Sequence, residues 1–366
     1  MSNNKKVKLL VFIPQINTDG INKVLADYIT GFSNDIVVEI MTLSIKDDMY
    51  FKNKKSLIIE IGNGKNVIKR FTNEYKRIKA GNYDVVHING NYCSRLLECL
   101  AAKKAGVKKI IIHSHNSGSG NNNFIRKAIH NILKKMFDIV ATDYYACSEA
   151  AAKWMFSKHI IERKKWQLIK NGIVIDKYRF NSKIRKKIRN KYNIDNKFVV
   201  GHIGRFEKQK NHNFLIEIFK QYKEKNKDSV LLLIGCGPLE EEIKNKIKRE
   251  GLLNSVLFLG VINNANEFHN AMDCFLFPSL FEGLGLVLVE AQTNGVKCLT
   301  SSNVPCEAKL SDNIDYISLS EQPLVWANQI CKTNSKYRQG AYRDTIKSGY
   351  DIKAVINNLE NNIKKR

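Results

Sequence analysis

The feature that most constrains this chain is the alternation of short apolar runs with segments of helical periodicity. The runs are continuous rather than alternating, which predicts strands buried on both faces of a sheet. Residues 21–32 carry apolar side chains at helical spacing, and similar stretches separate other runs. The alternation predicts βα units on a parallel sheet. In the first half the runs are VKLLVFI (7–13), DIVVEIM (35–41), DVVHI (84–88), KIIIHSH (109–115) and IVATDYYAC (139–147).

A second series of the same kind follows residue 195, and helix-like segments at 213–226, 238–250, 264–272 and 285–294 accompany it. Its runs are FVVGHIG (198–204), VLLLIG (230–235), VLFLG (256–260), DCFLFP (273–278) and VKCLTS (296–301). A chain of 366 residues is longer than one hydrophobic core usually holds, so we expect two α/β domains.

The domain boundary is expected near 177–191, a segment with eight basic residues and no acidic one. The expected domains are therefore 1–175 and 176–344, with a C-terminal helix at 345–366 completing the first.

The charge is strongly unbalanced. Lys and Arg number 60 against 35 Asp and Glu, and the first 191 residues carry +22 of the net +25. Such an excess suits an anionic partner: nucleic acid, phospholipid headgroups or a phosphorylated substrate. The basic clusters are Lys52, Lys54 and Lys55; Lys103, Lys104, Lys108 and Lys109; Arg126, Lys127, Lys134 and Lys135; and Arg163 to Lys165.

The segment IRKAIHNILKKMF (125–137) predicts a helix with an apolar face and flanking cations, a pattern suited to the surface of an anionic membrane. The alternative is an ordinary helix that packs its apolar face on the sheet.

The cysteines contain no C-x-x-C pair and sit among apolar neighbours, so we interpret them as reduced core residues of a cytoplasmic protein. Lys5, Lys6 and Lys8 precede only a short apolar run, Leu9 to Ile13, and no run approaches the ~20 apolar residues that span a bilayer. We expect neither secretion nor membrane spanning, and peripheral attachment to the inner leaflet stays open. The cysteines are Cys93, Cys99, Cys147, Cys236, Cys274, Cys298, Cys306 and Cys331.

The stretch FPSLFEGLGLVLVEAQTNGV (277–296) reads as a strand, a Gly-rich turn and a helix starting near Gly285. Backbone N–H groups of Gly283 to Leu286 could cradle a phosphate at the helix N-terminus. Glu282 and Glu290 could accept hydrogen bonds from neighbouring sugar hydroxyls. The alternative is a surface loop with one solvated and one helix-capping glutamate.

Arg205 and Lys210 follow the run VVGHIG and are placed to bind a diphosphate, although such a pair could equally be solvated. The carboxyl ends of parallel strands share one edge, where loops 204–210, 235–238, 260–264 and 281–285 could surround a nucleotide. The first predicted βα loop has a single Gly20 and no G-x-G-x-x-G, which argues against a nicotinamide site.

With these motifs in order along nearly its whole length, the sequence resembles the GT-B glycosyltransferases of family 4, especially bacterial capsule and exopolysaccharide enzymes. The residues that carry the resemblance are HSHNS (113–117), ACSEAAAKWMF (146–156), KNGIVIDKYRF (170–180), GRFEKQKNH (204–212), GCGPLEEEI (235–243) and the E-x7-E element from Glu282 to Glu290.

The resemblance implies two Rossmann-like domains facing each other across a cleft, the first binding the acceptor and the second the nucleotide-sugar. It implies transfer with retained anomeric configuration, without metal or cofactor. Arg205 and Lys210 would hold the diphosphate together with Gly204, and Glu282 the transferred sugar. Gly283, Leu284, Gly285 and Leu286 would bind through backbone amides, Glu290 would bind the ribose, and Val261 would lie beside the base. Where the family usually has two adjacent glycines, this chain has Asp19 and Gly20.

The family also carries a histidine at the end of a first-domain strand, facing the donor sugar. His115 is our choice and His113 the competitor, because HSHN offers both before the loop GSGNNN (118–123). His202 and His212 are interpreted as packing or capping residues.

The sequence thus predicts a retaining, metal-independent transferase. It would move a hexose or N-acetylhexosamine from a nucleoside-diphosphate sugar, we expect a UDP-sugar, to a lipid-linked or cell-surface saccharide. The chain has no D-x-D to hold a metal against the diphosphate. One alternative is a UDP-sugar 2-epimerase of the same fold. The other is a basic protein that binds nucleic acid or membranes, although no aromatic-basic stacking motif supports nucleic acid.

Overall fold

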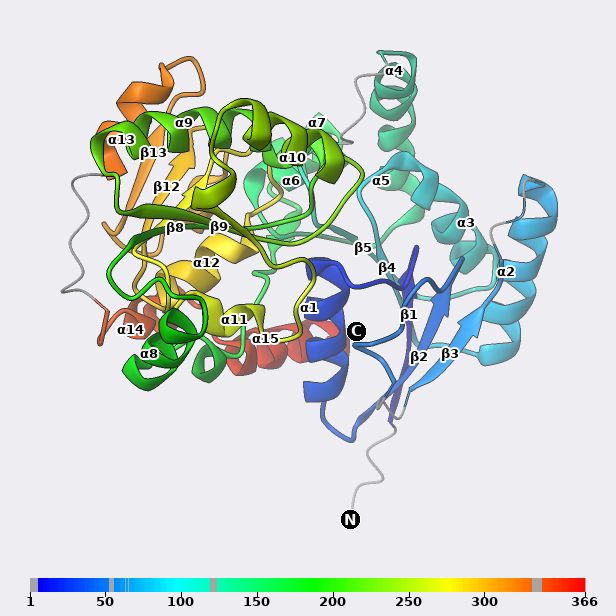
Figure 1. Ribbon diagram of the computed structural model, residues 1–366. Helices are drawn as coiled ribbons and strands as arrows, with labels where there is room; N and C mark the ends of the chain where they lie inside the picture. The colour runs from blue at the N-terminus through cyan, green and yellow to red at the C-terminus, as the bar shows by residue number, and fades with distance from the viewer. Residues whose placement is uncertain are drawn as a thin grey trace. The chain divides into compact units, whose positions relative to one another are not determined.

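The computed structural model describes residues 6–52, 56–62, 64, 66–118, 124–330 and 338–365. Predictions on Lys5, Lys54, Lys55, Cys331 and residues 119–123 fall outside this part of the chain. Two compact units form: Met1–Gly172 with Ile352–Arg366, and Ile173–Asp351. Each is α/β with a parallel sheet, which confirms the predicted fold class (Figure 1).

The first unit contains a seven-stranded sheet in the order β3-β2-β1-β4-β5-β6-β7, with every neighbouring pair parallel. The central strands are continuous apolar runs, and each residue of β4 is buried. The strands are β1 Val7–Ile13, β2 Ile36–Thr42, β3 Leu57–Glu60, β4 Val85–Asn89, β5 Lys109–Ser114, β6 Asp143–Ala146 and β7 Trp166–Leu168.

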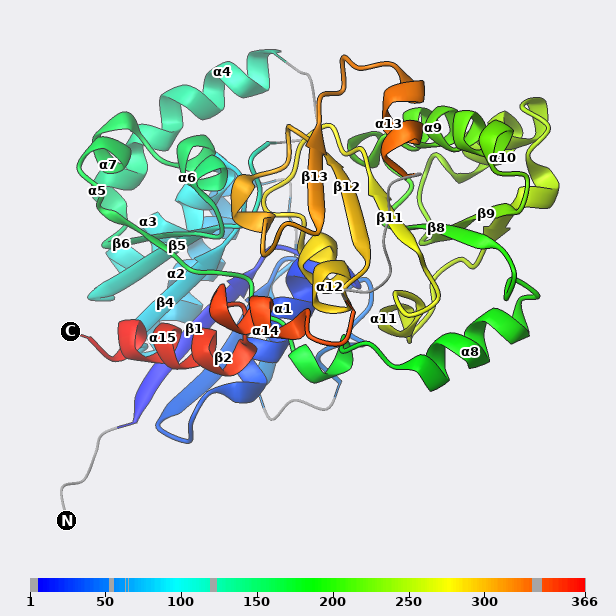
Figure 2. The same ribbon diagram turned by 90° about the vertical axis from the view of Figure 1, so that its left-hand side faces the viewer.

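Along the chain, the helices of the first unit alternate with these strands. Helix α15, from the C-terminal segment, packs beside α1 (Figure 2). The approach is close, since a Cβ added to Gly31 would lie 2.2 Å from Ile356 Cδ1. The helices are α1 Gly20–Gly31, α2 Val67–Gly81, α3 Leu96–Lys104, α4 Phe124–Leu133, α5 Phe137–Val140, α6 Glu149–Met155, α7 Lys158–Glu162 and α15 Ile352–Lys364, with 3-10 turns η1 Cys93–Arg95 and η2 Lys134–Met136.

The second unit contains a six-stranded parallel sheet in the order β10-β9-β8-β11-β12-β13. The strands are β8 Phe198–Ile203, β9 Ser229–Ile234, β10 Val256–Phe258, β11 Cys274–Phe277, β12 Lys297–Ser301 and β13 Ile314–Ile317. The helices are α8 Ser182–Lys191, α9 His212–Lys225, α10 Glu240–Arg249, α11 Ala265–Phe268, α12 Leu286–Thr293, α13 Pro323–Ile330 and α14 Tyr342–Lys347, with 3-10 turns η3 Ile175–Lys177, η4 Lys208–Lys210, η5 Leu253–Ser255 and η6 Cys306–Ala308.

Helices α9, α10 and α13 cover one face of this sheet, while α12 and α14 lie on the other (Figures 1 and 2). Phe219 of α9, Ile247 of α10 and Trp326 of α13 form one core with Leu231 and Leu276 of the strands. This two-sided burial explains why the strand sequences are continuous apolar runs rather than alternating ones.

Several element predictions need correction. The predicted strand 139–147 is helical up to Val140 and extended only in β6, because α5 turns Val140 into the core before the strand begins. The helix predicted for 264–272 is shorter in the structure, where it forms α11. The basic segment 177–191 is mostly helix α8, which buries Ile188. Strands β3, β7 and β13 are not among the predicted ones.

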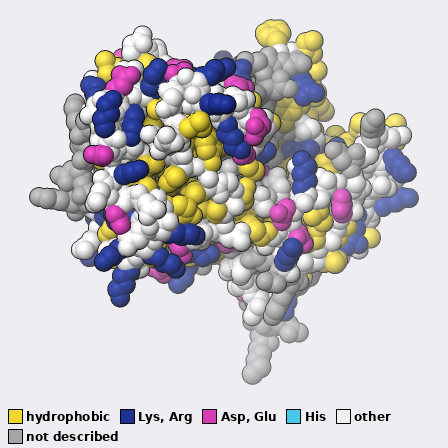
Figure 3. All heavy atoms as spheres, in the orientation of Figure 1, with side chains coloured by type: hydrophobic (Ala, Val, Ile, Leu, Met, Phe, Trp, Pro, Cys, Tyr) yellow, Lys and Arg dark blue, Asp and Glu magenta, His cyan; other side chains and the backbone are white. Residues whose placement is uncertain are grey.

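Helix α4 differs from the expectation that its apolar face packs on the sheet. Exposed fractions are 67% for Ile125, 46% for Ile129 and 68% for Ile132, whereas His130 and Phe137 are fully buried. Figure 3 shows hydrophobic side chains gathered on the surface over α4. Among the described residues, no helix is both long and apolar enough to cross a bilayer.

Candidate functional site

The loop from β11 to α12 holds Glu282, the first of the two predicted carboxylates. Gly285 caps α12 with φ 81°, a left-handed conformation that favours glycine, and Leu286 starts the helix. Glu282 is only 6% exposed, and Gly283 and Leu284 are buried as well. The loop is therefore a packed feature of the sheet edge, and the alternative of a solvated surface loop is wrong for Glu282.

Lys210 lies against this loop. Its Nζ is 2.6 Å from Glu282 Oε1 and 4.6 Å from the centre of the Phe277 ring, and the two charged side chains are 17% and 7% exposed. Gln209 ties the loops together, because its side chain donates to Phe281 O at 3.0 Å and its carbonyl accepts from Leu280 N at 2.8 Å. The structure thus brings the two predicted sequence motifs into one site.

Arg205 lies on the same loop as Lys210 but is more open. Its side chain is 58% exposed and pairs with Glu207 Oε1 at 2.8 Å rather than with either predicted carboxylate. An exposed pair of this kind contributes little to stability, which leaves the guanidinium available to an anion.

Glycines let the neighbouring loops approach one another. A Cβ on Gly235, where φ is 133°, would lie 2.1 Å from Gly204 O. A Cβ on Gly204 would be 3.0 Å from His202 Nε2 and 3.3 Å from Lys210 Cγ. The loops after β8 and β9 therefore close on each other through their backbones. Val261, in the loop after β10, is 64% exposed.

Glu290 lies on α12 and is half-buried. Its Oε1 accepts a hydrogen bond of 2.5 Å from the Tyr178 hydroxyl, whose ring is buried. Sequence reasoning gave Tyr178 no role. The contact joins residues 112 positions apart, so no local pattern could have indicated it.

Gly20 and His115 belong to the first unit. Gly20 is exposed as the first residue of α1, where the Asp19 side chain caps the helix by accepting from Asn22 N at 2.8 Å. His115 follows the carboxyl end of β5 and is 4% exposed. Its Nε2 lies 2.9 Å from Asn89 Oδ1, and its backbone N–H donates to Asn91 Oδ1.

His113 lies within β5, fully buried, with Nδ1 3.1 Å from His87 Nε2. Burial lowers the pKa of His87 to about 3 and that of His115 to about 4, and burial holds the pKa of His113 well below its ordinary value. All three imidazoles are therefore neutral at neutral pH.

His202 and His212 lie in the second unit and pack against each other edge to face. His202 Nδ1 is 2.9 Å from Leu276 O, and its ring stacks on Phe277. Burial lowers the pKa of His212 to about 4. These contacts agree with packing roles for both.

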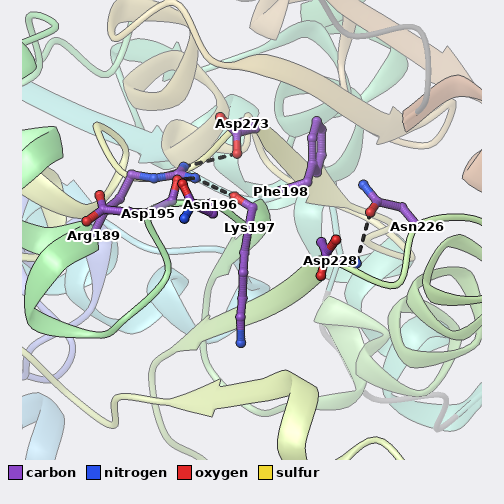
Figure 4. Close-up of a pocket in the computed structure, with 8 residues that line it drawn as sticks. All are labelled: Arg189, Asp195, Asn196, Lys197, Phe198, Asn226, Asp228 and Asp273. Atoms are coloured by element: carbon purple, nitrogen blue, oxygen red, sulfur yellow. Dashed lines mark hydrogen bonds and ion pairs between the residues drawn. The ribbon is translucent and has the colours of Figure 1, made fainter.

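A pocket of about 430 Å³ lies at the opposite edge of the second sheet, where β8 and β9 begin (Figure 4). Arg189 and Asp273 line it and pair with each other at 3.1 Å. It includes none of the predicted site residues. Among the described residues, no group of three or more His, Cys, Asp or Glu side chains could hold a metal ion.

Comparison with known proteins gives the following matches. Residues 20–177 match the family described as Glycosyltransferase Family 4, and residues 184–315 match Glycosyl transferases group 1. EpsF of Bacillus subtilis, a protein named as a glycosyltransferase, is 32% identical over 289 residues, which are 77% of this chain and 74% of EpsF. The UDP-Gal:alpha-D-GlcNAc-diphosphoundecaprenol alpha-1,3-galactosyltransferase of Escherichia coli is 29% identical over 64% of this chain and 62% of that protein.

Among solved structures, HepE of Anabaena in complex with UDP and glucose matches with a TM-score of 0.82 at 17% identity. The match covers 98% of this chain and all of that one, which supports the same fold. Because the two family matches follow in chain order and EpsF is similar over most of both chains, this chain belongs to glycosyltransferase family 4 and is a glycosyltransferase.

Proposed function

We propose that this enzyme transfers a hexose or N-acetylhexosamine from a UDP-sugar to a lipid-linked saccharide during polysaccharide biosynthesis. The single observation that carries the proposal is the contact of Lys210 with Glu282 beside the N-terminus of α12. It joins a cation for a diphosphate to a carboxylate for a sugar, at the sheet edge where open α/β folds bind ligands.

The donor would lie along this edge. Lys210, Arg205, Gly204 and the backbone N–H groups from Gly283 to Leu286 would hold the diphosphate. Glu282 would bind the sugar, Glu290 the ribose hydroxyls, and Val261 would lie beside the base. Two similar proteins support a UDP-sugar: the E. coli relative is named as a UDP-Gal transferase, and HepE was crystallised with UDP and glucose.

The chemistry follows from where charge develops. Breaking the bond from the sugar C1 to the diphosphate builds negative charge on the leaving phosphate, which Lys210, Arg205 and the α12 N-terminus would stabilise. Positive charge on the sugar ring would be offset by Glu282, whose burial strengthens the interaction. With these cations supplied by the protein, a divalent metal is dispensable in this proposal.

Retention would follow from attack on the face that the diphosphate leaves, with the acceptor hydroxyl passing its proton to the departing phosphate oxygen. Glu282 is then a positioning group, since a retaining hydrolase needs two carboxyl groups converging on one bond.

The acceptor would be presented at a membrane. The E. coli relative is named for a diphosphoundecaprenol acceptor, which supports a lipid-linked one here. Helix α4 and the residues after it form what we call the α4 surface, whose apolar side chains are 40–83% exposed: Phe124, Ile125, Ile129, Ile132, Met136 and Ile139.

Cations complete this surface. Arg126, Lys127 and Lys135 are exposed around it. Lys134 differs, because its Nζ donates hydrogen bonds to the backbone carbonyls of Lys153 and Trp154 and so links two segments of the unit. Apolar side chains ringed by cations suit the headgroup region of an anionic bilayer at the inner leaflet.

A donor panel tests the proposal. The purified enzyme is screened by thermal shift against UDP-, GDP- and ADP-sugars, where a binder at 100 times its Kd should stabilise by roughly 2.7 kcal/mol. The sugar that binds is then offered with and without a lipid-linked saccharide, in EDTA. We expect a UDP-sugar to be consumed only with acceptor, and EDTA to leave the rate unchanged.

Two results would contradict the proposal. Conversion of the UDP-sugar without acceptor would favour the 2-epimerase alternative. Loss of activity in EDTA, restored by Mn²⁺ or Mg²⁺, would reject metal independence. Family membership already makes the chain an enzyme, so a basic binding protein without catalytic activity is set aside.

A further inference from the structure

Gln209 binds the loop after β11 at two successive residues. Its carbonyl accepts a hydrogen bond from Leu280 N at 2.8 Å, and its side-chain Nε2 donates to Phe281 O at 3.0 Å. The next residue, Lys210, continues the series with its contact to Glu282 Oε1. Two successive residues of the 3-10 turn η4 thus meet three successive residues of the other loop, and the position of Gln209 fixes how closely Lys210 can approach Glu282.

Side chains at and after the end of β12 hold the same loop from another side. Ser301 Oγ donates to Ser279 O at 2.5 Å, and the exposed Asn303 donates from Nδ2 to Leu280 O at 2.9 Å. These bonds restrict the backbone that leads to Glu282. They do not involve the loop after β8, whereas the contacts of Gln209 do.

A bound diphosphate would act differently on the ion pair and on the amide contact. The Lys210 ammonium has three N–H groups, and a phosphate that accepts from one of them competes with Glu282 for its charge. The amide of Gln209 is neutral and is bonded to a backbone carbonyl, so the negative charge of a ligand acts on it much less. The link made by Gln209 therefore persists when the ion pair is weakened.

We propose that Gln209 is a positioning residue of the donor site, which keeps Lys210 beside the diphosphate and Glu282 beside the sugar when the donor loosens their ion pair. The effect on transfer rests on the proposed function, whereas the link between the two loops does not. Lys210 and Glu282 would stabilise opposite charges of one breaking bond. A shift of one relative to the other should therefore lower kcat more than it weakens the binding of UDP.

The link between the loops is tested first, without any substrate. The Leu280 N–H donates to the Gln209 carbonyl, so its hydrogen exchange in the full-length enzyme, followed by NMR, reports how firmly the loops are joined. Gln209→Met keeps an unbranched side chain of similar length without the amide, and Gln209→Glu keeps the shape but, when ionised, can only accept. We expect the Leu280 amide to exchange at least about tenfold faster in both variants. The matched control is Asn303→Ala, which removes another bond to Leu280 and should change the exchange less than about threefold.

Two results of the exchange experiment would overturn the inference. One is a Leu280 amide that exchanges in the wild type as fast as in an unstructured peptide, which would count even if both variants failed to fold. The other is equal exchange in the wild type and in a folded Gln209 variant, because the side chain would then not hold the loops together.

The effect on transfer is measured with the donor found in the panel. Gln209→Met should lower kcat roughly tenfold, the worth of a single hydrogen bond, and change the Kd for free UDP less than about threefold. In a Lys210→Ala background the same substitution should cost less than about threefold, because the cation that Gln209 positions is gone. Asn303→Ala should keep kcat within about twofold of the wild type.

A Gln209→Met enzyme with the kcat of the wild type would reject the positioning role. An undiminished loss in the Lys210→Ala background would also reject it, because Gln209 would then not act through Lys210. If no UDP-sugar were a substrate while the Leu280 amide exchanged faster in the variants, the proposed donor would be wrong and the link made by Gln209 would stand.

Discussion

Lys210 Nζ lies 2.6 Å from Glu282 Oε1, and this ion pair joins the loop after β8 to the loop after β11. Both side chains are largely buried, so their charges interact more strongly than a surface pair would. A ligand diphosphate that approaches Lys210 would therefore meet a cation already held in place.

Lys210→Ala should lower kcat/KM by about 100-fold or more, because it removes the cation that we propose to stabilise the leaving phosphate. Lys208→Ala is the matched control: this exposed lysine occupies the same 3-10 turn, and its loss should change the rate less than twofold. Steady-state kinetics with the donor found in the panel measures both. A Lys210→Ala enzyme with near wild-type activity would reject the assigned role.

Substitution of Glu290 and substitution of Glu282 should have different effects on the affinity for UDP. Glu290→Ala should weaken binding of free UDP by roughly 1 to 3 kcal/mol, because the ribose hydroxyls would lose the acceptor proposed for them. Glu282→Ala should leave UDP affinity nearly intact and lower the transfer rate. Calorimetric titration of UDP into both variants checks this, and equal UDP affinity of Glu290→Ala and wild type would rule out the ribose role.

Tyr178→Phe tests the partner of Glu290. Loss of its hydroxyl removes one orienting hydrogen bond to the carboxylate, so UDP should bind about tenfold more weakly. Tyr222→Phe provides the control, since Tyr222 is equally buried in α9 but bonds Asn226 instead. Similar UDP affinities in the two variants would show that Glu290 does not depend on Tyr178.

The α4 surface should bind vesicles that contain anionic lipid, and binding should fall as salt rises from about 0.05 to 0.5 M. Replacing Ile125 and Ile132 by Ser should weaken cosedimentation at least tenfold, as should replacing Arg126 and Lys127 by Glu. Serine at Val67 and Ile68, an exposed apolar pair on α2, is the matched control. Equal binding to neutral vesicles would contradict the electrostatic part of the proposal.

Acid should destabilise the protein through its buried histidines. His87, His115 and His212 have folded pKa values of about 3, 4 and 4, below the ordinary value near 6.5 of the unfolded chain. The stability they contribute is fully present above about pH 6.5 and is lost as pH falls from there toward the folded pKa.

In that window each of these histidines should lower the free energy of unfolding by about 1.4 kcal/mol for each unit by which the pH falls. For His115 the loss should reach roughly 3 kcal/mol by pH 4. Urea unfolding at several pH values measures the change, and His87→Asn should reduce the slope. A midpoint that stays constant from about pH 7 to pH 5 would contradict the prediction.

The sequence alone determined the α/β class, because a strand covered by helices on both faces must be apolar throughout. The same patterns located most strands, from β1 to β12, and the Gly-rich turn before α12. Strands β7 and β13 were not located, because a polar residue interrupts the apolar ones in WQL and IDYI. Helix α5 was misread because its apolar residues lie directly before β6.

The tertiary structure alone decided which side chains meet. Local sequence pattern relates only near neighbours, whereas the Lys210 contact with Glu282 and the Tyr178 contact with Glu290 join residues 72 and 112 positions apart. It also decided that Lys134 donates to the backbone carbonyls of Lys153 and Trp154, and that α4 leaves its apolar face exposed. The partner of a charged or apolar side chain depends on how strands and helices are brought together, and the chain's local pattern does not contain that information.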